Sequence, residues 1–129
     1  MQEIKYKKVN IENYPQLKIE AKKAGILFSK ETDIYLMTLG TKTVGICGLL
    51  LRKGSAVMKC DYVKPYFRRQ GILKECIKRR IKLCQDKGIQ RISAHCTKMA
   101  LNVHLSCGAI IKKNFKNGIT EVQYTIPEK

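Results

Sequence analysis

The pattern of hydrophobic and polar positions along this chain of 129 residues predicts an ordered series of strands and helices. Residues 2–9 alternate apolar and polar side chains, which predicts a first strand. Residues 14–24 carry apolar positions among lysines and end before Gly25, which predicts a helix with a glycine at its C-terminal end. Three runs rich in β-forming residues follow at residues 34–39, 43–51 and 55–63. Because the turns between these runs are short, the runs predict an antiparallel meander.

A helix with one apolar face is predicted over residues 73–87. Apolar residues recur there at spacings of three and four, at Leu73, Cys76, Ile77, Ile81 and Cys84. Most lysines and arginines of this segment fall on the other side of the helix, and Gly88 marks its end. The segment therefore predicts an amphipathic helix with a basic outer surface.

The last part of the chain predicts a strand, a helix and a hairpin. Residues 91–96 alternate like a strand, and Thr97 is placed to cap a helix that ends at Ser106. The hairpin is formed by two further runs, residues 109–115 and 120–126, joined at Asn117-Gly118. The order β-α-β-β-β-α-β-α-β-β indicates one α+β domain over residues 1–129, with a mixed, mostly antiparallel sheet. The long connection through the basic helix predicts that the fourth and fifth strands are parallel.

Composition excludes several other classes of protein. A hydrophobic fraction of 44% without low-complexity runs favours a folded domain over a disordered basic tail. No segment approaches the roughly 20 apolar residues that a membrane-spanning helix needs. The first residues have no apolar core and no small-residue cleavage site, so no signal peptide is recognisable. We therefore expect a cytoplasmic protein that does not insert into a membrane.

Six cysteines raise the question of disulfides or a metal site. Disulfides need a secreted context, which the sequence does not indicate. The nearest two cysteines, Cys76 and Cys84, are eight positions apart, which does not match the close pairs of a zinc site. We expect free, mostly buried thiols and no bound metal.

The net charge of +16 favours a polyanionic partner. Nucleic acid, an acidic membrane surface and a phosphate-bearing small molecule all satisfy this requirement. Charge alone does not choose among the three.

The loop between residues 63 and 73 carries the clearest functional signal. A strand ends there and a helix begins, so unpaired backbone N–H groups at the positive end of the helix dipole suit a phosphate. Gly71 lets the backbone approach an anion closely, and Arg68, Arg69 and Lys74 add positive charge. The alternative is an ordinary helix start that carries solvated basic residues.

This loop resembles the acetyl-CoA-binding motif of the GNAT superfamily of N-acetyltransferases. The family pattern is Gln/Arg-x-x-Gly-x-Gly/Ala, commonly preceded by Val-x-Pro-x-Tyr/Phe. The chain matches it at Val63, Pro65, Phe67, Arg68 and Gly71. Leu73 departs from it, because a second small residue is usual at that position. The order of elements also matches the family fold, so the resemblance covers nearly the whole chain.

The resemblance implies an enzyme that moves an acetyl group from acetyl-CoA directly to a primary amine of a small molecule or peptide. In this family the fourth and fifth strands splay apart, and the pantetheine arm of the cofactor lies in the gap, beside the backbone of residues 61–63. The cofactor-binding residues implied for this chain are Tyr62, Val63, Arg68, Arg69, Gln70, Gly71, Ile72, Leu73, Lys74 and Thr97.

The resemblance also suggests a catalytic acid. A tyrosine four residues before a glycine commonly protonates the departing thiolate in this family, and His104 occupies that position before Gly108. Histidine can donate a proton near neutral pH. The alternative is a helix histidine with a structural role.

The candidate base is Asp61, the only carboxylate close to the expected gap. Its alternative role is an ion pair with a lysine such as Lys59. Glu121 is a weaker candidate for the base, His95 is expected to be structural, and ordered water can replace a dedicated base.

Two other functions remain open. One is a catalytically impaired GNAT-fold protein that binds CoA. The other is a nucleic-acid-binding module that uses the lysines of residues 73–87, which the scarcity of aromatic residues disfavours. The acceptor is expected to contact residues 14–30 and the last hairpin, whose lysines suit an acidic or neutral acceptor. An exposed strand edge could also pair two copies of the chain.

Overall fold

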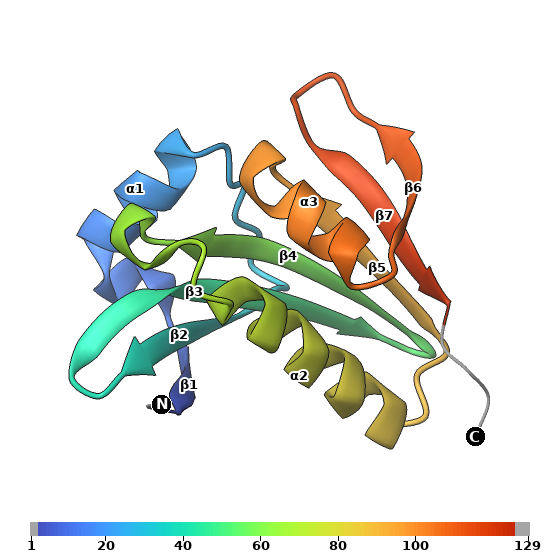
Figure 1. Ribbon diagram of the computed structural model, residues 1–129, viewed down its shortest axis with the longest axis horizontal. Helices are drawn as coiled ribbons and strands as arrows, with labels where there is room; N and C mark the ends of the chain where they lie inside the picture. Colours follow the sequence, from blue (N-terminus) through green and yellow to red (C-terminus); the bar gives the residue numbers. More distant parts are fainter. Residues whose placement is uncertain (1–2, 126–129) are drawn as a thin grey trace.

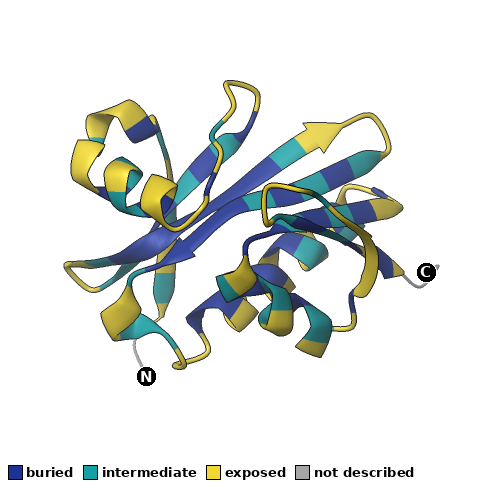
Figure 2. Ribbon diagram, turned by 90° about the horizontal axis from the view of Figure 1, so that it is seen from above, coloured by how far each residue is buried: buried dark blue, intermediate teal, exposed yellow. Residues whose placement is uncertain are grey.

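A computed structural model describes residues 3–125, which form a seven-stranded sheet with helices on both faces (Figures 1 and 2). The strands are β1 (Ile4–Val9), β2 (Asp33–Leu39), β3 (Lys42–Arg52), β4 (Ser55–Val63), β5 (Arg91–Cys96), β6 (Ile110–Asn114) and β7 (Thr120–Thr125). The helices are α1 (Pro15–Lys23), α2 (Ile72–Asp86) and α3 (Lys98–Ser106), with short 3-10 turns η1 (Ile11–Asn13) and η2 (Pro65–Phe67). The spatial order of the strands is β1-β2-β3-β4-β5-β7-β6.

The predicted order of elements and the mixed character of the sheet are confirmed. Every neighbouring pair of strands is antiparallel except β4 and β5, which are parallel. The outer ends of the first and last predicted strands, at Gln2 and Ile126, lie outside the described residues. None of the helices within residues 3–125 combines the length and apolar character needed to cross a membrane.

Each face of the sheet has its own hydrophobic core. Helices α2 and α3 cover one face and α1 covers the other (Figure 2). The larger cluster joins sheet residues such as Met58 and Ile92 to the buried side of α2 at Cys76 and Ile77. The smaller cluster packs α1 against β2, β3 and β4 through Leu17, Ala21, Ile34, Ile46 and Tyr62. Alternation along the strands sends successive side chains to these two cores.

The parallel pair separates before its strands end. Strands β4 and β5 are paired only from Ser55 with Arg91 to Met58 with Ala94. Strand β4 then continues to Val63, and β5 continues to Cys96, without pairing to each other. The middle of the sheet therefore contains a gap between the carboxyl ends of its two parallel strands.

A β-bulge in β4 accompanies this separation. Two β4 residues, Cys60 and Asp61, lie opposite the single β3 residue Cys47, and Cys60 has a left-handed backbone with φ 62°. Glycines of β3 flank the bulge. A Cβ atom on Gly48 would lie 2.4 Å from the carbonyl oxygen of Lys59. Strand β3 thus needs a residue without a side chain at this position beside the bulge.

Candidate active site

The loop from β4 to α2 presents the start of the helix without a side-chain cap. Gly71 is the N-cap residue of α2, with φ 81°, and within residues 3–125 no side chain bonds to the first N–H groups of the helix. Arg69 also has a left-handed backbone, with φ 64°. Two left-handed residues in three positions turn the chain sharply from η2 into α2. The first N–H groups of α2 are consequently free to bind an anion.

A cavity of about 550 Å³ lies beside this loop, between α2 and α3, and we call it the loop cavity. It is lined by Val63, Phe67, Arg68, Arg69, Gly71, Ile72, Leu73, Lys74, Met99, Asn102, Val103 and Ser106. Of the residues that the sequence predicts to bind the cofactor, all but Tyr62, Gln70 and Thr97 line it. The described residues therefore bring the predicted basic loop and the first turn of α2 to one concave surface.

Arg68 links the loop to the end of β4. Its Nε donates a hydrogen bond of 2.8 Å to the carbonyl oxygen of Val63, and its guanidinium lies 5.5 Å from the centre of the Tyr62 ring. Tyr62 itself is buried in the core beneath α1. The side chain of Gln70 turns back to the loop, where its Nε2 donates to the carbonyl oxygen of Tyr66 at 3.2 Å. Arg68 and Gln70 thus contribute to the shape of the loop.

Gly71 is required for its backbone conformation. A Cβ atom there would meet nothing within 4 Å, so its positive φ is the reason for a glycine. We expect Gly71→Ala to cost about 1 kcal/mol of unfolding free energy, measured by urea denaturation. Gly54→Ala is the matched control, because Gly54 has φ 73° and equally open surroundings in the turn between β3 and β4. Only Gly71→Ala should also weaken the binding of a phosphate-bearing ligand in the loop cavity, and equal binding by the two variants would contradict this prediction.

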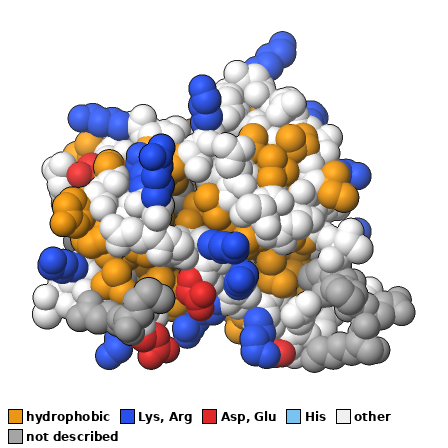
Figure 3. Space-filling model, in the orientation of Figure 1, with side chains coloured by type: hydrophobic (Ala, Val, Ile, Leu, Met, Phe, Trp, Pro, Cys, Tyr) orange, Lys and Arg blue, Asp and Glu red, His pale blue; other side chains and the backbone are white. Residues whose placement is uncertain are grey.

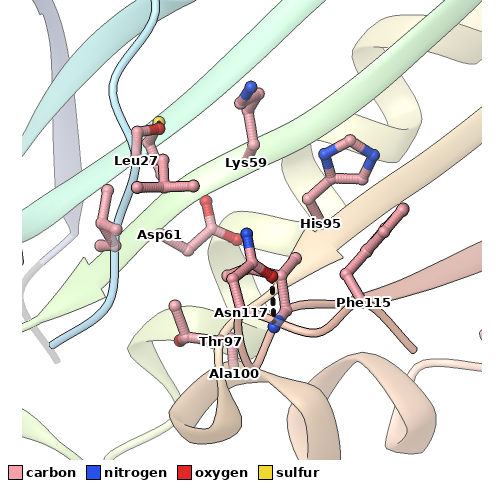
Figure 4. Close-up of a pocket in the computed structure, with 11 residues that line it drawn as sticks. Leu27, Lys59, Asp61, His95, Thr97, Ala100, Phe115 and Asn117 are labelled. Atoms are coloured by element: carbon pink, nitrogen blue, oxygen red, sulfur yellow. Dashed lines mark hydrogen bonds between the residues drawn. The ribbon is translucent and has the colours of Figure 1, made fainter. Parts of the chain in front are cut away.

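A second cavity, of about 220 Å³, lies beneath the β6–β7 hairpin, and we call it the hairpin cavity (Figure 4). Five parts of the chain meet there: the segment after α1, the ends of β4 and β5, the start of α3 and the hairpin. Its lining residues are Ile26, Leu27, Lys59, Cys60, Asp61, His95, Thr97, Ala100, Phe115, Asn117 and Ile119. The cavity therefore lies where β4 and β5 separate.

The hydroxyl group of Thr97 has no partner in the hairpin cavity. Thr97 is the N-cap residue of α3, as predicted, but its side chain makes no capping hydrogen bond. Its Oγ1 is buried and unpaired among the described residues, and only 7% of the residue is exposed. Buried hydroxyl groups normally have a hydrogen-bond partner.

Asp61 forms a buried ion pair with Arg80 of α2. Arg80 donates to both carboxylate oxygens at 2.8 Å and also to the carbonyl oxygen of Gly48 at 2.8 Å. Burial alone would raise the pKa of Asp61, but the Arg80 guanidinium and the His104 ring together hold that pKa below its ordinary value. Sequence reasoning suggested Lys59 as the ionic partner and missed Arg80.

His104 extends this buried group of polar side chains. Its side chain is 1% exposed, its Nδ1 lies 2.7 Å from the hydroxyl group of Tyr124, and its Nε2 lies 3.4 Å from Oδ2 of Asp61. The Tyr124 hydroxyl in turn donates to the carbonyl oxygen of His104 at 3.3 Å. The chain of contacts runs from Arg80 through Asp61 and His104 to Tyr124.

His104 has a neighbouring residue in the wall of each cavity. Asp61, which contacts the His104 ring, lines the hairpin cavity. Val103, the residue before His104 on α3, lines the loop cavity. Helix α3 therefore supplies side chains to the walls of both cavities, while His104 itself is buried and lines neither.

His95 and Glu121 form a second, more exposed pair at the rim of the hairpin cavity. They are opposite each other on β5 and β7, His95 Nε2 lies 3.7 Å from Glu121 Oε2, and about a third of each side chain is exposed. The His95 ring also packs edge-on against Phe115, with ring centres 6.0 Å apart. Burial and the neighbouring Lys59 lower the pKa of His95, although Glu121 opposes this effect.

Comparison with known proteins finds similarity at the level of the fold. No protein-family model matches the sequence, and no curated protein sequence matches it. An acetyltransferase from Thermus thermophilus superposes with a TM-score of 0.76 at 13% identity, covering 98% of this chain and 100% of that one.

Two similar structures contain bound coenzyme A. The PaiA N-acetyltransferase of Thermoplasma acidophilum with coenzyme A has a TM-score of 0.72 at 12% identity, covering 96% of this chain and 99% of that one. The spermidine N-acetyltransferase of Vibrio cholerae with CoA and spermine has a TM-score of 0.72 at 11% identity, covering 95% of each chain. The chain therefore has the fold of the GNAT acetyltransferases, and the resemblance suggested by the loop motif is confirmed for the fold.

Proposed function

We propose that this chain is an N-acetyltransferase that transfers an acetyl group from acetyl-CoA directly to a primary amine. The observation that supports this most strongly is the arrangement of the two cavities. The loop cavity contains the basic helix start, and the hairpin cavity lies where the parallel strands separate. Such an arrangement offers one site for a phosphate-bearing donor and another for its acceptor.

The loop cavity suits the pyrophosphate of the cofactor. The first N–H groups of α2 supply hydrogen-bond donors, and Arg69 and Lys74 supply exposed positive charge. Leu73 is only 7% exposed and belongs to the larger core, so most of its side chain packs inside the protein instead of filling the cavity. The departure from the family pattern at this position therefore leaves the backbone donors available.

The gap between β4 and β5 suits the pantetheine arm. The unpaired ends of these strands offer backbone groups to an extended ligand, in the manner of an added strand. We place the thioester end in the hairpin cavity, which Thr97 lines at the start of α3. This placement puts Thr97 near the reacting end of the cofactor, away from the pyrophosphate.

In the proposed reaction the amine nitrogen bonds to the carbonyl carbon of the thioester, and the carbon–sulfur bond then breaks. The nitrogen loses one proton, and the departing thiolate gains one. We assign the second proton to His104, which contacts Asp61 of the hairpin cavity and follows Val103 of the loop cavity on α3. The first proton leaves towards solvent at the rim of the hairpin cavity, where His95 and Glu121 lie.

Asp61 receives a positioning role in this proposal. Its carboxylate is engaged by Arg80 and its pKa is held low, so it is a weak proton acceptor for an amine. The contact with Nε2 orients the His104 ring. Asp61 acts on the reaction through His104. The sequence suggested Asp61 as the base, but in this proposal the amine proton leaves at the solvent-exposed rim, where His95 and Glu121 lie.

The similar structures with bound CoA support this proposal, because their fold is the fold of this chain. We further propose that residues 1–129 act as one acetyltransferase domain. A cytoplasmic location and pairing of two copies stay predictions.

A nucleic-acid-binding function is less well supported. On the face that carries α2 and α3, lysine and arginine side chains are scattered among neutral and apolar ones (Figure 3). Nucleic-acid-binding surfaces gather positive charge in a patch or stripe and often add stacked aromatic residues.

The test is acetyl-CoA binding followed by transfer. We expect acetyl-CoA to raise the Tm of the protein, and an amine to release free thiol from the complex. A Tm shift without thiol release from any amine would support the CoA-binding alternative instead. Binding to random nucleic acid that weakens with salt, with no shift by acetyl-CoA, would contradict the proposal.

A matched pair of lysines on α2 tests the location of the cofactor. Lys74 lines the loop cavity, whereas Lys78, one turn further along the same helix, does not. We expect Lys74→Ala to raise the Kd for acetyl-CoA about fivefold, equivalent to ~1 kcal/mol. Lys78→Ala should leave the Kd unchanged, as measured by isothermal titration calorimetry. Equal effects of the two substitutions would show that only overall charge attracts the cofactor.

A further inference from the structure

We infer that the acceptor is a compact amine with an apolar body and a carboxylate group, of which an apolar α-amino acid is the simplest example, and that Lys59 binds the carboxylate. This inference rests on the proposed function and concerns the hairpin cavity.

The size of the hairpin cavity limits the acceptor. Its volume of about 220 Å³ lies below the roughly 300–1,000 Å³ of pockets that hold drug-sized ligands. The cavity is further shared with the acetyl end of the cofactor in the proposed reaction. Only a small molecule, or one end of a longer molecule, fits in the remaining space.

The walls of the hairpin cavity are mostly apolar. They are formed by Ile26, Leu27, Ala100, Phe115 and Ile119, which come from separate parts of the chain. Apolar walls favour an acceptor that buries an aliphatic or aromatic body there.

The charged groups around the hairpin cavity favour an acceptor that carries a carboxylate group over one that carries a second ammonium group. Its lining carboxylate, Asp61, is held by Arg80, and Glu121 at the rim is paired with His95. Within residues 3–125, Lys59 makes no salt bridge, and Figure 4 shows its side chain at the edge of the cavity between Leu27 and His95. An acceptor with a second ammonium group finds no free carboxylate among these lining residues, whereas a carboxylate finds a free ammonium group.

The acceptor class is tested with leucine, leucinamide and spermidine as acceptors, by following thiol release from acetyl-CoA. Leucinamide has the same apolar body as leucine, lacks the carboxylate, and has the less basic amine. Without carboxylate recognition, leucinamide should therefore be the better acceptor. We expect leucine to have a kcat/KM about tenfold above that of leucinamide, and spermidine to be the poorest acceptor.

The role of Lys59 is tested by Lys59→Gln. We expect this variant to raise the KM for leucine about tenfold and to change the KM for leucinamide by less than about twofold. Lys53→Gln, in the exposed turn between β3 and β4, is the control and should behave like the wild-type protein.

Three outcomes would overturn the inference: a preference for leucinamide or spermidine, an unchanged leucine preference in Lys59→Gln, or acetyl-CoA binding without acetylation of any of the three. In the first two cases the proposed acetyltransferase function survives. Absence of an acetyl-CoA-dependent Tm shift would instead contradict the proposed function itself.

Discussion

Replacing Asp61 with asparagine is expected to lower the free energy of unfolding by about 3–5 kcal/mol. The side chains of Asp61 and Arg80 are 4% and 6% exposed, so the substitution leaves a buried guanidinium without a counter-charge. Two hydrogen bonds from Arg80 and the contact with His104 are weakened by the same change. Urea denaturation of the two proteins measures the difference.

Two variants separate this effect from a simple loss of one charge. Asp33→Asn removes an exposed partner of Lys8 and should cost less than about 1 kcal/mol. The double variant Asp61→Asn with Arg80→Met removes both buried charges, so it should be more stable than either single variant. A cost for Asp61→Asn as small as that for Asp33→Asn would show that the buried pair contributes little.

The pH dependence gives an internal check on the same substitution. The folded-state pKa of Asp61 lies below its ordinary value of about 3.9. Its contribution to stability is therefore fully present above the ordinary pKa and is lost as the pH falls through the folded-state value. The difference between wild type and Asp61→Asn should be constant near neutrality and shrink in acid.

Replacing His104 with glutamine is expected to lower kcat for amine acetylation by about 100-fold or more, with an unchanged Kd for acetyl-CoA. The imidazole is assigned to protonate the departing thiolate, and glutamine keeps a polar group near Asp61 and Tyr124 but has no titratable proton. Steady-state kinetics at saturating amine measures kcat, and calorimetry measures the Kd.

An acetyl donor with a different leaving group distinguishes a catalytic role from a structural one. 4-Nitrophenyl acetate releases an anion that is stable without a proton, so its reaction should be much less sensitive to His104→Gln. Equal losses with both donors would mean that the substitution disturbs the site as a whole. Tyr124→Phe, which removes the hydroxyl group beside Nδ1, should reduce kcat less than His104→Gln does.

The order and type of the elements could be predicted because local signals agreed with one another. Gly25 and Gly88 follow the ends of α1 and α2 with φ 99° and 73°, as glycines that end helices do. Gly118, with φ 82°, turns the chain between β6 and β7. Each of these positions depends on a few neighbouring residues, which sequence reasoning can read.

The bulge in β4 could not be predicted from the sequence. Cysteine rarely has a left-handed backbone, and nothing in the residues around Cys60 indicates one. The conformation depends on contacts between distant segments. The Cys60 thiol donates to the carbonyl oxygen of Leu27 at 3.4 Å, and Gly48 of β3 makes room beside the bulge.

Arg80 was missed although the sequence contains a signal for it. Arg80 is four residues from both Cys76 and Cys84, so it falls on the apolar face of α2 with them. A charged residue within an apolar stripe requires a buried partner of opposite charge. That requirement, applied to the few acidic residues of the chain, would have directed attention to Asp61.

The short parallel pairing has a consequence for the motions of the protein. Four paired positions join the meander β1–β4 to the three-stranded unit of β5, β7 and β6, whereas the antiparallel neighbours on either side pair along most of their length. The larger hydrophobic core nevertheless continues across this seam, from Met58 of β4 to Ile92 of β5 and Val122 of β7, so opening the seam would also break that core. The two units are therefore expected to move together, and the unpaired strand ends beside the seam are the place for a long, flexible ligand to enter.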